Sequence, residues 1–270
     1  MSAAEKNLIG LNCVVTRDPA RQEALAMPLR AHGAEVLSMP LATLAPCTLL
    51  RPLREEIDTI ARGHARPWLL ATSAPALSFF TEALIAEGIS PAELSGWRGA
   101  YVGAKSAAAA KRLGLPAGLH GEKFSAEGLF DALIAQLGSL QGERFLFPRA
   151  KVADPKLIES LHAAGAFVHL IPLYEAHSLP VSSASRARLL DDNRRWCVTL
   201  CSAETASRFR ALWREEEWVR LAPRLRFASI GPSTSTRLRA LKLSVDCEAK
   251  PHSLEGLIAS IEAAWAAQKL

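Results

Sequence analysis

The stretch SIGPSTSTRLRALKLSVDCEAKPHSLEGL, residues 229–257, contains a Gly-Pro-Ser-Thr turn and closes with Ser-Leu-Glu-Gly-Leu. The stretch YVGAKSAAAAKRLGLPAGLHGEKFSAEGL, residues 101–129, has the same order of features at a constant offset of 128 residues. The matching positions are Gly103 with Gly231, Ser106 with Thr234, and Gly128 with Gly256. A turn that occurs twice at a fixed offset indicates an internal repeat.

The repeat continues toward the N-terminus. LLATSAPALSFF, residues 69–80, matches VTLCSAETASRF, residues 198–209. Further upstream, VVTRDPARQEALAMPLRAHGAEVLSMPL (14–41) matches FLFPRAKVADPKLIESLHAAGAFVHLIPL (145–173). The chain is therefore a duplication with a period of about 130 residues. This period is too long for a solenoid repeat and predicts two similar domains.

Each copy alternates short β-rich runs with helical stretches, which predicts parallel sheets covered by helices on both faces. Five strands in each copy favour two flavodoxin-like, doubly wound α/β domains. Strands are expected near 12–16, 35–39, 68–72, 99–103, 118–121, 144–148, 167–171, 196–200, 226–230 and 245–249. Helices are expected near 20–32, 50–62, 75–87, 105–113, 125–137, 155–164, 182–193, 203–217, 234–241 and 253–267.

Two proline-marked extended segments, 38–46 and 170–180, are the best candidates for a two-stranded linker. With linker strands at 41–46 and 170–177, one domain is continuous and the other is built from both ends of the chain. The continuous domain is expected at 47–169. The discontinuous domain is expected to combine 1–40 with 178–270.

The composition fits a globular protein, with 49% hydrophobic and 22% charged residues among 270. The net charge of +5 favours anionic partners without selecting one. The first thirty residues have no signal pattern, and no apolar run reaches the roughly 18 residues that span a bilayer, so the expected location is the cytoplasm. The five cysteines form no C-x-x-C pair and the seven histidines have no metal spacing, so no metal is expected.

Small, hydroxylic and arginine side chains follow the predicted strands, immediately before helices. Ligands of open parallel sheets bind at the carboxyl ends of the strands, and helix N-termini attract anions. These positions predict binding of carboxylates or phosphates. Taken singly, each Ser or Thr can equally be an ordinary helix cap, and the two interpretations are compatible. The candidates are Thr16, Arg17, Ser73, Gly103, Ser106, Arg149, Ser202, Gly231, Ser233 and Thr234.

The sequence contains no phosphate-binding loop, dinucleotide fingerprint or G-x-S-x-G motif. Tyr174, one of only two tyrosines, lies in the second proline-marked segment. It is interpreted either as a linker aromatic that packs between domains or as a general acid. A phenol pKa near 10 makes tyrosine a proton donor at neutral pH.

Together, VVTRDPARQ, ATSAPALSFF, YVGAKSAAAAKRLGL, PLYEAHSLP, CSAETASRF and SIGPSTSTRLRALKL resemble the uroporphyrinogen-III synthase family over nearly the whole chain. The resemblance implies two flavodoxin-like domains, no cofactor, and a linear tetrapyrrole substrate, hydroxymethylbilane. A monomer is expected because the duplication already supplies two walls for a cleft. The implied reaction loses the terminal hydroxyl as water, inverts ring D and closes the macrocycle, with Tyr174 as a suspected donor. Each domain would hold part of the polycarboxylate, which explains the duplicated turn. Transient transfer of the substrate from hydroxymethylbilane synthase is also implied.

Two alternatives to the synthase stay open. The family's Phe-Thr-Ser-Pro pattern is replaced by Ala71-Thr72-Ser73-Ala74, and Glu175 adds a negative charge beside Tyr174. These departures suit a non-catalytic binder of tetrapyrroles or small anions on the same fold. The basic residues Arg220, Arg224 and Arg226 raise nucleic-acid binding as the second alternative, but acidic residues are interleaved with the basic ones and no aromatic platform accompanies them.

Overall fold

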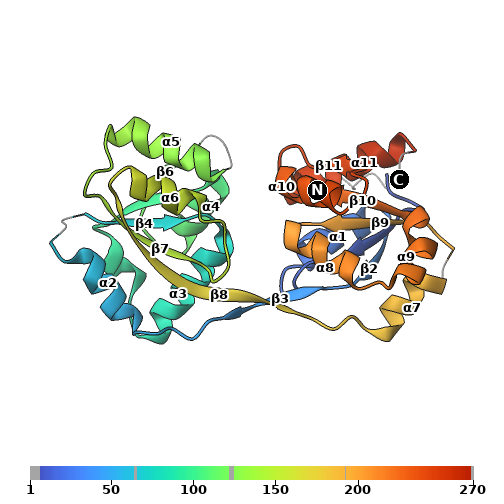
Figure 1. Ribbon diagram of the computed structural model, residues 1–270, viewed down its shortest axis with the longest axis horizontal. Helices are drawn as coiled ribbons and strands as arrows, with labels where there is room; N and C mark the ends of the chain where they lie inside the picture. Colours follow the sequence, from blue (N-terminus) through green and yellow to red (C-terminus); the bar gives the residue numbers. More distant parts are fainter. Residues whose placement is uncertain (1–6, 64–65, 122–124, 192, 269–270) are drawn as a thin grey trace. The chain divides into compact units, whose positions relative to one another are not determined.

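The computed structural model describes residues 7–63, 66–121, 125–191 and 193–268. The chain divides into two compact units (Figure 1): unit 1 consists of residues 1–44 and 176–270, and unit 2 of residues 45–175. The segments expected to be linkers, 41–46 and 170–177, fall largely within two strands, β3 (Ala42–Pro46) and β8 (Phe167–Ser178). Both strands belong to the sheet of unit 2.

The sheet of unit 1 has five parallel strands in the order β11-β10-β9-β1-β2. Helices α1 and α11 cover one face, and α7, α8, α9 and α10 contribute the core of the other. The strands are β1 (Asn12–Val15), β2 (Glu35–Ser38), β9 (Trp196–Leu200), β10 (Leu225–Ser229) and β11 (Cys247–Glu248). The helices are α1 (Glu23–Ala31), α7 (Ser183–Asp191), α8 (Ala203–Ala211), α9 (Glu215–Leu221), α10 (Pro232–Ala240), α11 (Leu254–Ala266) and the 3₁₀ helix η2 (Ala222–Arg224).

The sheet of unit 2 has the order β3-β8-β7-β4-β5-β6. Helices α5 and α6 enclose a core on one face, and α2, α3 and α4 pack on the other (Figure 1). The remaining strands are β4 (Trp68–Ala71), β5 (Arg98–Tyr101), β6 (Gly118–His120) and β7 (Arg144–Ala150). The helices are α2 (Leu53–Ala61), α3 (Ala74–Ala86), α4 (Gly103–Arg112), α5 (Ala126–Leu137), α6 (Lys156–Ala163) and the 3₁₀ helix η1 (Pro91–Leu94).

The two sheets have one topology. Numbered along unit 1, the strand order is 2-1-3-4-5, the flavodoxin-like arrangement. Unit 2 repeats it in β8-β7-β4-β5-β6, where β7 and β8 correspond to β1 and β2 of the other copy. Apart from β3, which adds a sixth strand to the sheet of unit 2, each sheet therefore combines two strands from one copy with three from the other. The predicted class, two doubly wound α/β domains of which one is discontinuous, is confirmed.

Two predicted helices differ from the structure. The helix expected at 20–32 begins at Glu23. Asp18 accepts the amide of Ala20 at 2.8 Å in the turn before the helix, and its other carboxylate oxygen accepts the amide of Leu44 at 2.7 Å in β3. The helix expected at 203–217 is two helices, α8 and α9. Between them Trp213 turns into the core with 4% exposure, and Glu217 accepts the amide of Arg214 at 2.9 Å to start the second helix.

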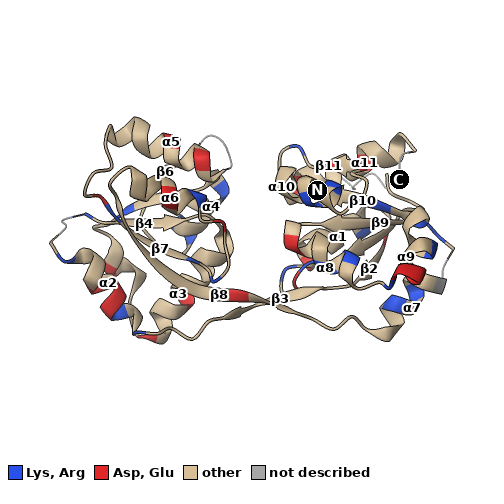
Figure 2. Cartoon of the chain, viewed as in Figure 1, with Lys and Arg blue, Asp and Glu red and all other residues tan. Residues whose placement is uncertain are grey.

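Within the described residues, no helix has both the length and the apolar character needed to cross a membrane. In the view of Figure 2, acidic and basic residues are interspersed along both units. This pattern gives nucleic-acid binding no support from the structure, because such binding needs clustered basic residues.

Candidate functional site

Tyr174 lies on β8 at the carboxyl end of the unit 2 sheet and is 8% exposed. Its hydroxyl lies 3.2 Å from the Oγ of Ser73, the residue that follows β4 and caps α3. The tyrosine ring stacks on Phe79 of α3, with 4.8 Å between ring centroids and an interplanar angle of 11°. Two elements thus fix the phenol, one through its ring and the other through its hydroxyl.

Arg149 ends the neighbouring strand, β7, and is also 8% exposed. In the strand register Arg149 faces Pro172 and Ala150 faces Tyr174, with an irregularity between Arg149 and Ala150. The guanidinium stacks over Phe147 at 5.3 Å and donates to the Asp154 carbonyl at 3.4 Å.

The charge of Arg149 is buried and electrostatically coupled to Tyr174. Burial lowers the pKa of Arg149, and the charges of Asp154 and of the Tyr174 phenolate act in the opposite direction. In the part of the chain that the structure describes, no carboxylate lies within ion-pair distance of this guanidinium. A buried cation of this kind favours a negative charge that forms beside it.

Glu175, the departure that adds negative charge beside Tyr174, is paired with a lysine. Its carboxylate lies 3.0 Å from the Nζ of Lys151. The pair flanks Cys47, whose pKa is raised mainly by burial and further by Glu175, while Lys151 lowers it. The ion pair largely balances the charge of Glu175, which removes one objection to an acidic ligand at this edge.

The turn at the start of α4 supplies the other unit 2 candidates. Gly103 has φ of +75°, a left-handed conformation that disfavours other residues and explains the glycine. The Val102 amide donates to the Ala71 carbonyl at 3.1 Å, which places this turn beside the end of β4. Ser106 is buried in the first turn of the helix, with 7% exposure, so it offers a ligand little surface.

In unit 1 the first candidates lie at the ends of β1 and β9. Thr16 is buried and its hydroxyl donates to the Thr199 carbonyl at 2.7 Å, so its proton serves the fold. Arg17 is half-buried, and its charge lowers the pKa of Cys201, which burial raises to about 11. Ser202 is exposed and caps α8 by accepting the Thr205 amide at 3.1 Å.

Hydrogen bonds among buried polar groups stabilise the turn that starts α10. The Ser229 hydroxyl accepts the Gly231 amide at 3.2 Å and lies 2.9 Å from the Ser235 hydroxyl, which also hydrogen-bonds Glu248. At the turn itself Ser233 is exposed, whereas Thr234 is 2% exposed. Only the backbone and the first hydroxyl of this turn are therefore open to a ligand.

The structure joins Ser73, Arg149 and Tyr174 in unit 2, while Thr16 and Thr234 face the interior of unit 1. Sequence reasoning missed Phe79. A signal existed in the repeat: the position of Phe79 is occupied by Arg208 in the other copy, and that of Tyr174 by Ala42. The aromatic pair of Phe79 and Tyr174 therefore has no counterpart in the other copy.

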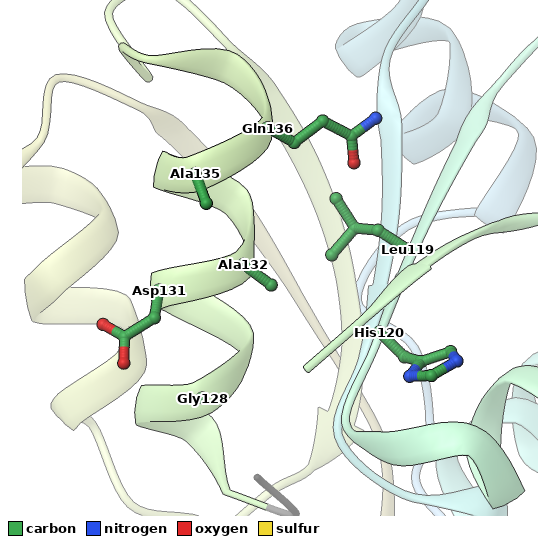
Figure 3. Close-up of a pocket in the computed structure, with 7 residues that line it drawn as sticks. All are labelled: Leu119, His120, Gly128, Asp131, Ala132, Ala135 and Gln136. Carbon is green, nitrogen blue, oxygen red and sulfur yellow. The ribbon is translucent and has the colours of Figure 1, made fainter. Parts of the chain in front are cut away.

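A cavity of about 580 Å³ lies elsewhere in unit 2, between β6 and α5. Figure 3 shows Leu119 of β6 directed toward Ala132 and Gln136 of α5, while the His120 ring and Asp131 point away. None of the predicted site residues lines it. The strand ends, rather than this cavity, carry the candidate site.

The fold and this strand-end site define a duplicated, doubly wound α/β protein. A family model described as "Uroporphyrinogen-III synthase HemD" matches residues 23–259. The uroporphyrinogen-III synthase of Synechococcus elongatus is 30% identical over 98% of this chain and 99% of its own length. The chain belongs to the uroporphyrinogen-III synthase family of tetrapyrrole biosynthesis. The "Porphyrin biosynthesis protein HemD" of Ruminiclostridium josui is 24% identical over 76% of this chain and 40% of its own length.

Solved structures agree on the fold. A mutant uroporphyrinogen III synthase from Thermus thermophilus aligns with a TM-score of 0.64 at 18% identity, covering 95% of this chain and 99% of that one. The uroporphyrinogen-III synthetase from Helicobacter pylori aligns with a TM-score of 0.60 at 14% identity, covering 92% and 96%. At such identities these alignments bear on the fold alone, and they support the two-domain α/β assignment.

Proposed function

We propose that this member of the uroporphyrinogen-III synthase family is a cyclising hydro-lyase that converts hydroxymethylbilane into uroporphyrinogen III. The observation that carries the proposal is the placement of Tyr174, whose hydroxyl is held by Ser73 at the carboxyl end of the sheet. In this proposal the phenol protonates the terminal hydroxyl of the substrate, which leaves as water. Ring D then inverts before the macrocycle closes. No resident cofactor takes part in these steps.

The substrate carries eight carboxylates, and both units have strand-end groups that suit anions. Proposed contacts in unit 1 are Arg17, Ser202, the Ser233 hydroxyl and the backbone of the turn that contains Gly231 and Thr234. In unit 2 the proposed contacts are in the turn that contains Gly103 and Ser106, and Ser73 and Arg149 act at the same edge through Tyr174. Thr16 lies at the same edge, but its hydroxyl proton is already donated to the Thr199 carbonyl, so we propose a structural contribution for it. Helix N-termini add roughly 0.3–1 kcal/mol each toward binding an anion.

We further propose that the protein acts in the cytoplasm as a monomer. The substrate, a linear tetrapyrrole, would be received in a transient encounter with hydroxymethylbilane synthase. The proposal includes no resident metal or cofactor. Sedimentation of the purified chain, alone and with hydroxymethylbilane synthase, tests the oligomeric state and the encounter.

The proposed reaction is tested by generating hydroxymethylbilane in situ, adding the protein, oxidising the products and separating the isomers. Unassisted closure produces the type I isomer, so a shift to type III is the expected result. Type I alone, formed in the presence of folded protein, would contradict the synthase and favour the non-catalytic binder. Titration with tetrapyrroles would then measure the affinity of that binder.

A further inference from the structure

Ser73 is already engaged as a helix cap, which uses one acceptor site of its Oγ and leaves its own proton available to donate to Tyr174. Its Oγ accepts the amide of Ala76 at 3.3 Å and lies 3.2 Å from the Tyr174 hydroxyl. A serine hydroxyl has one proton to donate. When Ser73 donates that proton to the Tyr174 oxygen, each group is used once, and the phenol proton points away from Ser73 toward another acceptor.

Two further contacts fix the orientation of the Tyr174 ring and of its backbone. Stacking on Phe79 fixes the plane of the ring, and the Lys151 amide donates to the Tyr174 carbonyl at 2.8 Å. An aromatic pair of this kind contributes to stability beyond its buried area. The phenol is thus presented in one orientation, as a proton donor requires.

Arg149 supplies a positive charge near Tyr174, where loss of the phenol proton leaves a negative charge. It ends the strand beside Tyr174, is nearly buried, and bonds only weakly to the Asp154 carbonyl at 3.4 Å. A buried cation without a carboxylate in ion-pair distance is costly, and an anion that forms next to it relieves that cost.

We propose that Ser73 and Arg149 are positioning residues for Tyr174: Ser73 directs the phenol proton toward the substrate, and Arg149 stabilises the phenolate left behind. The inference rests on the proposed synthase function. The phenol proton moves to the substrate hydroxyl, the carbon–oxygen bond breaks with its electron pair on oxygen, and water leaves. The cation on the substrate methylene is delocalised into its pyrrole. On closure, the attacked pyrrole carbon loses a proton, which restores the phenol.

Other ionisable groups surround Tyr174 and enter any pH profile. They come from β7 and the loop after it, from β8, and from the segment after β3: Arg149, Lys151, Asp154, Glu175 and Cys47. Because several groups titrate near the phenol, a pH profile alone cannot assign the effect to Arg149. A double-mutant cycle isolates the coupling between two residues.

The experiment compares Arg149→Met, Tyr174→Phe and the double variant in the full chain, measuring kcat and KM for type III formation. Tyr174→Phe is expected to lower kcat at least about 100-fold, as loss of a general acid does. Arg149→Met is expected to lower kcat about 10- to 100-fold, the size of one charge-assisted hydrogen bond, with KM little changed. In the Tyr174→Phe background Arg149→Met should cause almost no further loss.

Arg144→Met is the matched control, because Arg144 begins the same strand, donates to the Arg62 carbonyl at 2.9 Å and stacks over Phe167 at 5.6 Å. It should leave kcat unchanged. Thermal unfolding of every variant separates misfolding from slow chemistry. If Arg149→Met unfolds, Arg149→Lys replaces it in the cycle, with a smaller loss that should again vanish without the phenol.

Three results would contradict the inference, each in a different way. Losses that multiply in the double variant, while Tyr174→Phe is slow, mean that Arg149 acts on the substrate or on the fold, and only this inference fails. A full rate in Tyr174→Phe removes the proton donor itself, so the role given to Tyr174 in the proposed function fails with it. A rise in KM without a change in kcat for Arg149→Met would also assign Arg149 to substrate binding.

Discussion

At the scale of single residues, Ser73 has two roles. Ser73 caps α3 and holds the Tyr174 hydroxyl, whereas the similar cap Ser125 bonds only the Gly128 amide, at 3.1 Å, among its described contacts. A comparison of Ser73 with Ser125 therefore separates the contribution of capping to stability from an effect on the reaction. Capping accounts for about 1 kcal/mol at either position. Only the Ser73 position is connected to the proposed donor.

Ser73→Ala and Ser125→Ala should each lower the free energy of unfolding by about 1 kcal/mol, because each leaves an amide of the first helical turn unpaired. Ser73→Ala should in addition lower kcat about fivefold to tenfold, since the phenol loses one hydrogen bond. Denaturant unfolding and the isomer assay measure the two effects. Equal turnover in both variants would show that the Ser73–Tyr174 bond is irrelevant to the reaction.

At the scale of elements, the repeated Glu-Gly-Leu ending has a packing cause. Helix α11 starts so close to the preceding segment that a Cβ on Gly256 would lie 1.9 Å from the Pro251 carbonyl oxygen. In the other copy the backbone of Gly128 lies close to Gly121, where an added Cβ would be 2.6 Å from the Gly128 carbonyl. Helix α11 therefore needs glycine at position 256, whereas at the start of α5 the glycine that the close backbone contact requires is Gly121.

Gly256→Ala should destabilise the protein by about 1–3 kcal/mol, the usual cost of overpacking, because the obstacle is backbone and cannot rotate away. Gly96→Ala is the control, since a Cβ at Gly96 has no neighbour within 4 Å and the residue needs no left-handed conformation. Thermal unfolding of both variants tests the argument. If Gly256→Ala matched Gly96→Ala, the close approach would have no energetic weight.

At the scale of the whole molecule, the two copies of the repeat exchange strands: the first two strands of each copy join the sheet formed by the other. Each sheet takes β-strands from both copies, so neither copy of about 130 residues corresponds to a unit. Unit 2 is continuous in sequence and has its own core on the α5–α6 face. Its sheet includes β3 and all of β8, which extend beyond the predicted boundaries of 47 and 169.

A fragment of residues 42–178 should fold alone and unfold cooperatively, because it contains the whole six-stranded sheet. A fragment of residues 47–169 should be markedly less stable, because it lacks the buried residues Ile171, Leu173 and Tyr174. Circular dichroism during heating distinguishes the two. Equal stability of the fragments would mean that residues 170–178 act as a linker and contribute nothing to the fold of unit 2.

The sequence alone determined the duplication, the alternation of strands and helices, and the hydroxyl-rich turns at strand ends. These features are local, since hydrophobic periodicity and turn residues act over a few positions. Tertiary structure alone decided that Tyr174 meets Ser73, 101 positions away, and stacks on Phe79. It also decided that Thr16 and Thr234 are buried, and that Arg149 lies on the strand next to the one that carries Tyr174. Such contacts depend on which strands become neighbours, and strand order is set by the packing of the whole chain rather than by any one segment.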